Sequence, residues 1–143
     1  MIYKVKKPST IAEWENYYLF RWRILRKNLG MKKGSEKDDL EPVSIHRMIK
    51  RENDIIGVAR LHFKNKLEGQ IRFLAVDRKF RKLGLGRLLM NELILIAKKQ
   101  KIERIFLNSR YSAIGFYLKL GFKKIKRIDN KFDIIHFLME KKL

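Results

Sequence analysis

Residues 73–87, which read FLAVDRKFRKLGLGR, form the most informative stretch of the chain. An apolar run that ends at Val76 predicts a strand, a basic loop follows, and two glycines stand at the start of an apolar helix. The first turn of a helix presents unpaired N–H groups and a positive dipole end, and glycine lets a ligand oxygen approach the backbone. The stretch predicts either a phosphate-binding turn or an ordinary strand-to-helix turn in which the glycines serve only backbone flexibility. Its spacing matches neither a Walker loop nor the dinucleotide-binding G-x-G-x-x-G.

Residues 107–122, LNSRYSAIGFYLKLGF, form a second informative stretch. They predict the end of a strand and then a short helix that Gly121 terminates. Taken alone, Phe116 and Phe122 are expected in the core. Tyr117 is then an amphipathic aromatic residue whose hydroxyl finds a hydrogen-bond partner.

The two stretches together resemble a known family. The element R-x-x-G-x-G, followed about thirty residues later by A-x-x-F-Y-x-K-x-G-F, resembles motifs A and B of the GNAT superfamily of N-acetyltransferases. The resemblance covers roughly residues 55–122. The segment 20–26, the acidic loop 36–41 and His46 are also similar to the ElaA-like branch of that superfamily.

This resemblance implies a fold and an activity. The fold would be an α/β (α+β) domain over residues 1–143, with a GNAT-type mixed, mostly antiparallel central sheet flanked by helices on both faces. The activity would be transfer of the acetyl group of acetyl-CoA to a primary amine, on a small molecule or a peptide or protein, by direct attack in a ternary complex. Acetyl-CoA is the implied cosubstrate, and no metal is implied.

The resemblance also implies roles for particular residues. The backbone at Leu74 would stabilise the oxyanion, Tyr117 would be the general acid, and 81–87 would cradle the pyrophosphate. Arg78, Lys79 or Lys82 could reach the 3′-phosphate. The full set implied to bind the cofactor is Leu74, Ala75, Val76, Arg81, Lys82, Leu83, Gly84, Leu85, Gly86, Arg87, Asn108 and Tyr117. One departure is Arg110, because many members carry Asn at that place, and a cofactor contact there would have to come from a guanidinium.

The base that removes the proton of the amine is open between water and several side chains. The candidates are Glu36, Asp38, Glu41, His46 and His62, and each could instead be an ordinary surface or hydrogen-bonded residue. His62 is preferred, because it lies on the strand predicted to pair with the cofactor strand. Arg23 and Arg26 either line an acceptor pocket that takes a carboxylate or form the solvated face of a helix.

Hydrophobic periodicity and turn signals predict the order of the elements. On the strand that ends at Val76, one face is predicted to carry Ile71, Phe73 and Ala75, and the other Arg72, Leu74 and Val76. Thr10 is the predicted N-cap of the first helix, with Glu13 three residues later, and Gly30 ends it. Strands are predicted at 2–5, 44–51, 55–64, 70–76, 104–108, 122–127 and 134–140, and helices at 10–29, 84–101 and 113–120.

Composition limits the other possibilities. The 143 residues contain no cysteine, which excludes disulfides, cysteine-ligated zinc and a cysteine nucleophile. The longest apolar stretch, 88–97, is shorter than the ~20 residues that cross a bilayer. We therefore expect a soluble, cytoplasmic, single-domain protein, a monomer or homodimer, with no membrane partner.

The net charge of +20 keeps other functions open. It reflects either a compositional bias with solvated lysines or an anionic partner. The alternatives to an enzyme are a CoA-binding module without catalysis and a basic nucleic-acid-binding protein. The chain shows no nucleic-acid-binding motif, so we expect no specific nucleic-acid partner.

Overall fold

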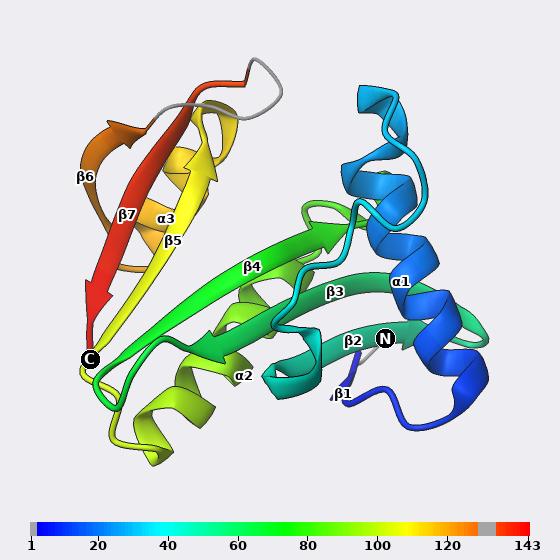
Figure 1. Ribbon diagram of the computed structural model, residues 1–143, viewed down its shortest axis with the longest axis horizontal. Helices are drawn as coiled ribbons and strands as arrows, with labels where there is room; N and C mark the ends of the chain where they lie inside the picture. Colours follow the sequence, from blue (N-terminus) through cyan, green and yellow to red (C-terminus); the bar gives the residue numbers. More distant parts are fainter. Residues whose placement is uncertain (1–2, 129–133) are drawn as a thin grey trace.

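The computed structural model describes residues 3–128 and 134–143. Within these residues, seven strands form one sheet of order β1-β2-β3-β4-β5-β7-β6 (Figure 1). Each neighbouring pair in it is antiparallel except β4 and β5. The strands are β1 (Val5–Lys6), β2 (Ile45–Arg51), β3 (Asp54–Phe63), β4 (Glu68–Val76), β5 (Arg104–Arg110), β6 (Lys123–Ile128) and β7 (His136–Lys142). The helices are α1 (Ile11–Leu25), α2 (Leu85–Lys99) and α3 (Ile114–Lys119).

This architecture confirms the predicted fold class, a mixed and mostly antiparallel sheet with helices on both faces. The predicted first strand is observed only as β1, and Ile2, where it was expected to begin, lies outside the described residues. The helix α1 is shorter than predicted. It ends at Leu25, and a 3-10 turn, η1 (Lys27–Leu29), leads to Gly30 in the left-handed region at φ 72°.

The start of α1 follows the predicted capping chemistry with one change of partner. The Thr10 hydroxyl accepts a hydrogen bond from the Glu13 N–H at 3.0 Å. The Glu13 carboxylate accepts from the N–H of Ser9 at 3.0 Å, one residue before the cap. Glu13 also binds Lys6 at 2.7 Å and Lys50 at 3.2 Å, which ties α1 to β1 and β2.

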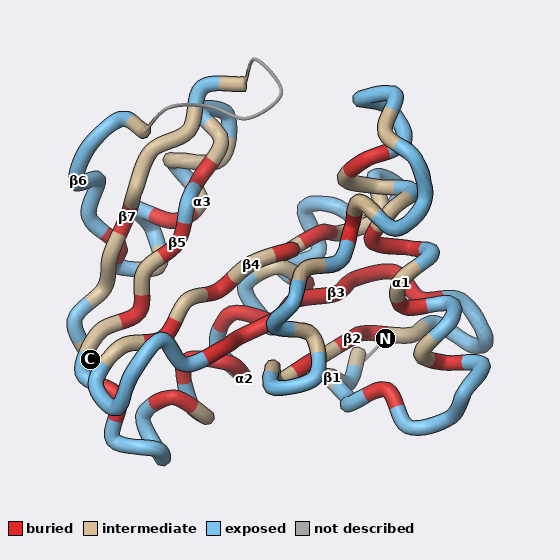
Figure 2. The backbone as a smooth tube through the Cα atoms, viewed as in Figure 1, coloured by how far each residue is buried: buried red, intermediate tan, exposed pale blue. Residues whose placement is uncertain are grey.

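Two hydrophobic clusters lie on opposite faces of the sheet. On one face, Leu89 and Leu93 of α2 pack with Leu61 and Ile105, all of them buried. On the other, Tyr17 and Phe20 of α1 pack with residues that include Met48, Val58 and Ala75. The central strand β3 is buried along most of its length (Figure 2). Each fully buried aliphatic side chain contributes about 1.5–3 kcal/mol, so these two clusters fix both helices on the sheet.

The strands β4 and β5 pair over only three positions. Glu68, Gly69 and Gln70 face residues 104–106 in parallel register. Beyond Gln70, β4 continues beside β3, while β5 continues beside β7, and Figure 1 shows the two strands diverging. Among the described residues, the edge of β4 that faces β5 therefore has no strand partner from residue 71 to 76.

A bulge in β4 overturns one prediction about its faces. Phe73 has a φ of 59°, and the register moves from Arg60 opposite Arg72 to Val58 opposite Ala75. The extra residue reverses the alternation. Ile71 consequently belongs to the cluster on the α2 side and Ala75 to the cluster on the α1 side. The prediction that Ile71, Phe73 and Ala75 share one face was wrong, because simple alternation assumes a strand without a bulge.

Candidate active site

A row of unpaired amides precedes and opens α2. Among the described residues, no protein acceptor binds the N–H groups of residues 82–87, and the first helical bond runs from Leu88 N–H to the Gly84 carbonyl at 3.0 Å. Lys82 and Gly84 both adopt left-handed backbone, with φ of 68° and 81°. Alternation of left- and right-handed residues turns successive N–H groups toward one concave side, and the helix dipole adds positive potential there. The row can hold an anion such as a diphosphate.

The two glycines of this turn serve different purposes. Gly84 adopts a conformation that L side chains rarely take, with open space around it. Gly86 allows close packing, because a Cβ there would lie 3.1 Å from the ring of Phe116. Gly86 therefore lets Phe116 of α3, the residue before Tyr117, pack closely on the start of α2.

Tyr117 is the buried aromatic residue of α3, with 9% of its surface exposed. Its ring packs edge-on against Phe116 and Phe122, with centroids 5.0 and 5.8 Å away. Burial raises the pKa of Tyr117 to about 12, so the phenol is protonated at neutral pH. Within the part of the chain that the structure describes, no group hydrogen-bonds to its hydroxyl. The partner expected from the sequence is absent among these residues, and the hydroxyl is available to a ligand.

Four arginines surround Phe73 at the bulge, and we call them the guanidinium cluster. The Cζ atoms lie 4.1 to 5.7 Å from the centroid of the Phe73 ring. Two members are fully buried, and the exposed fraction rises to 33% at the side chain of Arg72. Such contacts contribute about 0.5–2 kcal/mol each, with the larger values where water is excluded. The members are Arg21, Arg26, Arg60 and Arg72.

The acidic loop before β2 neutralises part of this cluster. Asp38 binds Arg60 through both carboxylate oxygens, at 2.6 and 3.0 Å, and Arg72 at 2.7 Å. Glu41 binds Arg21 at 2.9 Å and Arg60 at 2.7 Å. Burial, the largest single effect, would raise the pKa of Asp38, but its hydrogen bonds and the charges of Arg60 and Arg72 together outweigh burial and lower the pKa. The loop is therefore held on the sheet by ion pairs to guanidinium groups that are themselves buried.

The two candidate histidines have their lone pairs engaged. His62 Nδ1 lies 3.2 Å from Arg60 Nη2, which can only donate, so the proton of neutral His62 is on Nε2. His46 Nε2 lies 2.9 Å from the Glu41 carbonyl, which makes Nε2 the donor and leaves Nδ1 to accept from Tyr17 at 2.9 Å. Burial lowers the pKa of both histidines, so both are held neutral. Neither ring has a free lone pair to accept a proton from an amine.

The remaining sequence candidates lie at different depths. Asn108 is exposed on β5, and Arg110 is half-buried at the end of that strand. Glu36 is buried and accepts from the Gly34 N–H at 2.8 Å. Arg26 packs on Phe73, whereas Arg23 is exposed and lies over the ring of Phe20. The structure thus separates two arginines that the sequence analysis treated alike.

Sequence reasoning missed three members of the cluster as site residues. Arg21, Arg60 and Arg72 are separated by long stretches of sequence and meet only in the folded sheet. A signal was present in β3, because Arg60 interrupts the apolar run 55–63 at a central position where a charge requires a partner. A second signal was Tyr17 four residues before Arg21, one helical turn away.

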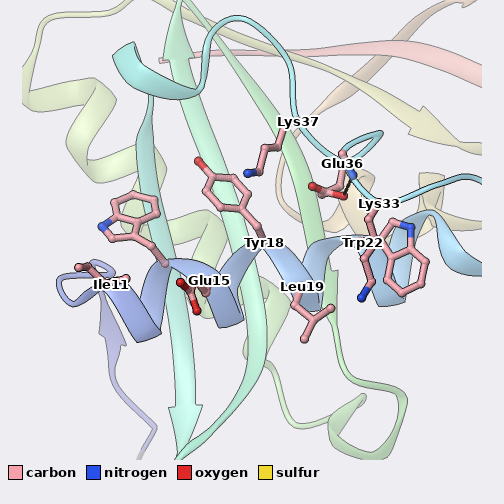
Figure 3. A pocket seen from close by; sticks show the side chains of 10 residues that line it. Ile11, Glu15, Tyr18, Leu19, Trp22, Lys33, Glu36 and Lys37 are labelled. Atoms are coloured by element: carbon pink, nitrogen blue, oxygen red, sulfur yellow. Dashed lines mark hydrogen bonds between the residues drawn. The ribbon is translucent and has the colours of Figure 1, made fainter.

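A shallow groove of about 630 Å³ lies elsewhere, between α1 and the loop that follows it. Figure 3 shows Trp22 and Tyr18 on this outer side of α1, with Lys33 and Lys37 near their rings. Its lining contains neither Tyr117, nor the amide row, nor any arginine of the guanidinium cluster. Among the described residues, no group of three or more His, Asp or Glu side chains could hold a metal ion. No described helix has the length and hydrophobicity that a membrane crossing requires.

Comparison with known proteins identifies the family. The sequence profile of the acetyltransferase (GNAT) family matches residues 2–122. The chain belongs to this family. A provisionally named acetyltransferase of Bacillus subtilis (strain 168) is 26% identical over 140 residues, which cover 96% of this chain and 95% of that protein.

Solved structures show the same GNAT fold. An aminoglycoside 6′-N-acetyltransferase in complex with coenzyme A matches with a TM-score of 0.81 and 16% identity, over 99% of this chain and 97% of that one. Escherichia coli ElaA matches with a TM-score of 0.79 and 12% identity, over 98% of each chain. The resemblance to the GNAT superfamily is confirmed, and the likeness to ElaA is one of fold.

Proposed function

We propose that this GNAT protein transfers the acetyl group of acetyl-CoA to a primary amine, on a small molecule or a peptide or protein. The observation that carries the proposal is the row of unpaired amides at residues 82–87. It lies at the start of α2, beside the helix that holds Tyr117. A diphosphate fits this row, because successive N–H donors at a helix start match its oxygens. The coenzyme A bound by the aminoglycoside 6′-N-acetyltransferase of the same fold supports the choice of ligand.

The unpaired edge of β4 would hold the pantetheine arm. Residues 74–76 have β3 on one side only, so their other edge can bond an extended chain as a further strand would. The proposed cofactor contacts are therefore Leu74, Ala75, Val76, Arg81, Lys82, Leu83, Gly84, Leu85, Gly86, Arg87, Asn108 and Tyr117. A reaction that draws on acetyl-CoA would take place in the cytoplasm.

In the proposed reaction the amine nitrogen attacks the thioester carbon directly. Binding both reactants on one surface can supply about 7–11 kcal/mol in effective concentration. The backbone N–H at Leu74 or Ala75 would donate to the developing oxyanion. The C–N bond then forms, the C–S bond breaks, and the sulfur receives a proton from Tyr117.

The high pKa of Tyr117 defines what it can contribute. A thiol has a pKa near 8.5 and Tyr117 one of about 12, so complete proton transfer to the thiolate costs about 5 kcal/mol at this site. Tyr117 would therefore act first as a hydrogen-bond donor that stabilises the sulfur as the C–S bond breaks. When the proton has moved to the sulfur, Tyr117 is left as a phenolate. The proton released by the amine then restores the phenol, so that no net proton is lost from Tyr117.

We assign the removal of the amine proton to water. The geometry of His62 does not favour the base role expected for it, since Arg60 donates a hydrogen bond to the lone pair of His62 Nδ1. The guanidinium cluster offers another route, because nearby positive charge disfavours an ammonium ion and so promotes the neutral, nucleophilic amine.

A coupled assay of thiol release tests this proposal. Acetyl-CoA is mixed with the protein and a panel of primary amines, and the acetylated product is identified by mass spectrometry. Release of free thiol that depends on the amine is the expected result. Saturable binding of acetyl-CoA without turnover on any amine would instead support a non-catalytic CoA-binding module. Oligonucleotides that raise the melting temperature at physiological salt, where acetyl-CoA does not, would support nucleic-acid binding.

A further inference from the structure

The α1 side of β4 carries more positive than negative charge beside the proposed thioester site. Asp38 and Glu41 are shared among three guanidinium groups, those of Arg21, Arg60 and Arg72. The next residue along β4 from Phe73, at the centre of the cluster, is Leu74, the proposed oxyanion donor. An acceptor that approaches the thioester from the α1 side therefore meets an excess of guanidinium charge.

Arg72 is the member of the cluster that remains open to a ligand. Its side chain is 33% exposed, while those of Arg21 and Arg60 are fully buried. Only its Nη1 donates to a described acceptor, the Asp38 carboxylate at 2.7 Å. The guanidinium of Arg72 keeps further N–H donors for a second oxyanion, and its planar shape suits a carboxylate.

Arg110 provides a second donor on the opposite strand. Leu107 of β5 points into the α2-side cluster, so alternation places Asn108 and Arg110 on the α1 side. Positive charge from Arg110 reaches Arg26 of α1, whose pKa is lowered first by burial and then by Arg72 and Arg110. Within residues 3–128 and 134–143, no carboxylate lies within ion-pair distance of Arg110, and no acceptor binds its side chain. Arg110 and Arg72 thus lie on the two strands that diverge, each within electrostatic reach of Arg26.

We propose that the amine acceptor of this enzyme carries a carboxylate, and that Arg72 and Arg110 bind it. The inference rests on the proposed acetyltransferase function and narrows its substrate class. Among the described residues the half-buried guanidinium of Arg110 has no counter-ion, which is costly, and a carboxylate offers the matching charge and a bidentate geometry. The carboxylate would orient the acceptor with its amine toward the thioester.

Matched pairs of probes test the charge requirement. The carboxylates are 4-aminobutanoate, 5-aminopentanoate and 6-aminohexanoate, each compared with its own carboxamide. Binding to the protein saturated with coenzyme A is measured by calorimetry, and acetyl transfer from acetyl-CoA by thiol release. We expect at least one carboxylate to bind about 10- to 100-fold more tightly than its amide, the usual effect of charge-assisted hydrogen bonds. Equal affinity within each pair, or no binding by any carboxylate, would overturn the inference.

Three variants locate the effect. Arg110→Gln and Arg72→Gln should each remove most of the preference for the carboxylate and leave the KM for acetyl-CoA within about twofold. Arg23→Gln removes the same charge from the exposed side of α1 and should keep the preference. An equal loss in Arg23→Gln would point to general electrostatics and contradict the site. A raised KM for acetyl-CoA in Arg110→Gln, with the carboxylate preference intact, would indicate that Arg110 binds the cofactor. That result would also contradict the proposed carboxylate site.

The outcomes separate this inference from the function on which it rests. Efficient turnover of carboxamides and carboxylates alike would leave the acetyltransferase function standing and overturn the carboxylate requirement alone. Failure of the protein to bind coenzyme A at all would overturn both.

Discussion

The two sides of β4 are built in different ways. On the α2 side, the proposed cofactor seat consists of backbone amides and two glycines within a few consecutive residues. On the α1 side, the guanidinium cluster consists of side chains from α1, β3 and β4, neutralised by a loop that precedes β2. A site of local backbone can be recognised from a short stretch of sequence, whereas a site of distant side chains is visible only in the folded chain.

Removal of a buried charge from the α1 side should have the largest effect. Arg60→Met removes the guanidinium that Asp38 and Glu41 share and leaves Asp38 with Arg72 and Glu41 with Arg21. Loss of several buried charge-assisted hydrogen bonds costs about 3–5 kcal/mol in total. Urea unfolding measures the change, with Arg23→Gln as the surface control, which should change stability by less than about 0.5 kcal/mol. A loss below about 1 kcal/mol in Arg60→Met would show that the ion pairs are not what holds the loop on the sheet.

On the α2 side, loss of one hydroxyl should reduce turnover without unfolding the protein. Tyr117→Phe keeps the ring packing with Phe116 and Phe122 and removes only the proposed donor to sulfur. We expect kcat to fall about 10²- to 10³-fold, while the Kd of acetyl-CoA stays within about twofold. An unchanged kcat would remove Tyr117 from the reaction.

Acid should lower the free energy of unfolding through the α1 side, because burial lowers the pKa of His46 and of His62 there. Each histidine is neutral in the folded state, whereas its pKa is about 6.5 in the unfolded chain. The contribution of the two neutral histidines to the free energy of unfolding is therefore complete above pH 6.5. It is lost as the pH falls through the folded-state pKa of each histidine. Each can contribute a slope of up to about 1.4 kcal/mol per pH unit. Urea unfolding between pH 7.5 and 5 should show this decline, and His46→Gln should make it shallower; the same slope in the variant would contradict the assignment.

The smallest effect expected is that of one methyl group in the amide row. Gly84→Ala and Gly30→Ala both place a Cβ on left-handed backbone in open space, so each should cost about 1–2 kcal/mol of stability. Only Gly84→Ala disturbs the proposed diphosphate seat, and it should weaken coenzyme A binding about tenfold. Equal coenzyme A affinity in the two variants would show that Gly84 is not part of the diphosphate-binding site.

The sequence predicted the fold, and it indicated the glycine-containing turn before α2, for a physical reason. Periodicity, Thr10, Gly30 and Gly121 are local signals, and each helix and strand follows from residues close to it in the chain. The bulge at Phe73 escaped prediction because left-handed backbone at phenylalanine is imposed by the sheet. The partners of Asp38 escaped too, because Arg60 and Arg72 are 22 and 34 residues away.

Isothermal calorimetry with coenzyme A and with pantetheine tests the central claim most directly. Pantetheine contains the arm that would lie along β4 but no diphosphate. If the amides of residues 82–87 bind a diphosphate, coenzyme A should bind at one site per chain, at least ~100-fold more tightly than pantetheine. Equal affinity for the two ligands, or no uptake of coenzyme A by the folded protein, would contradict the account.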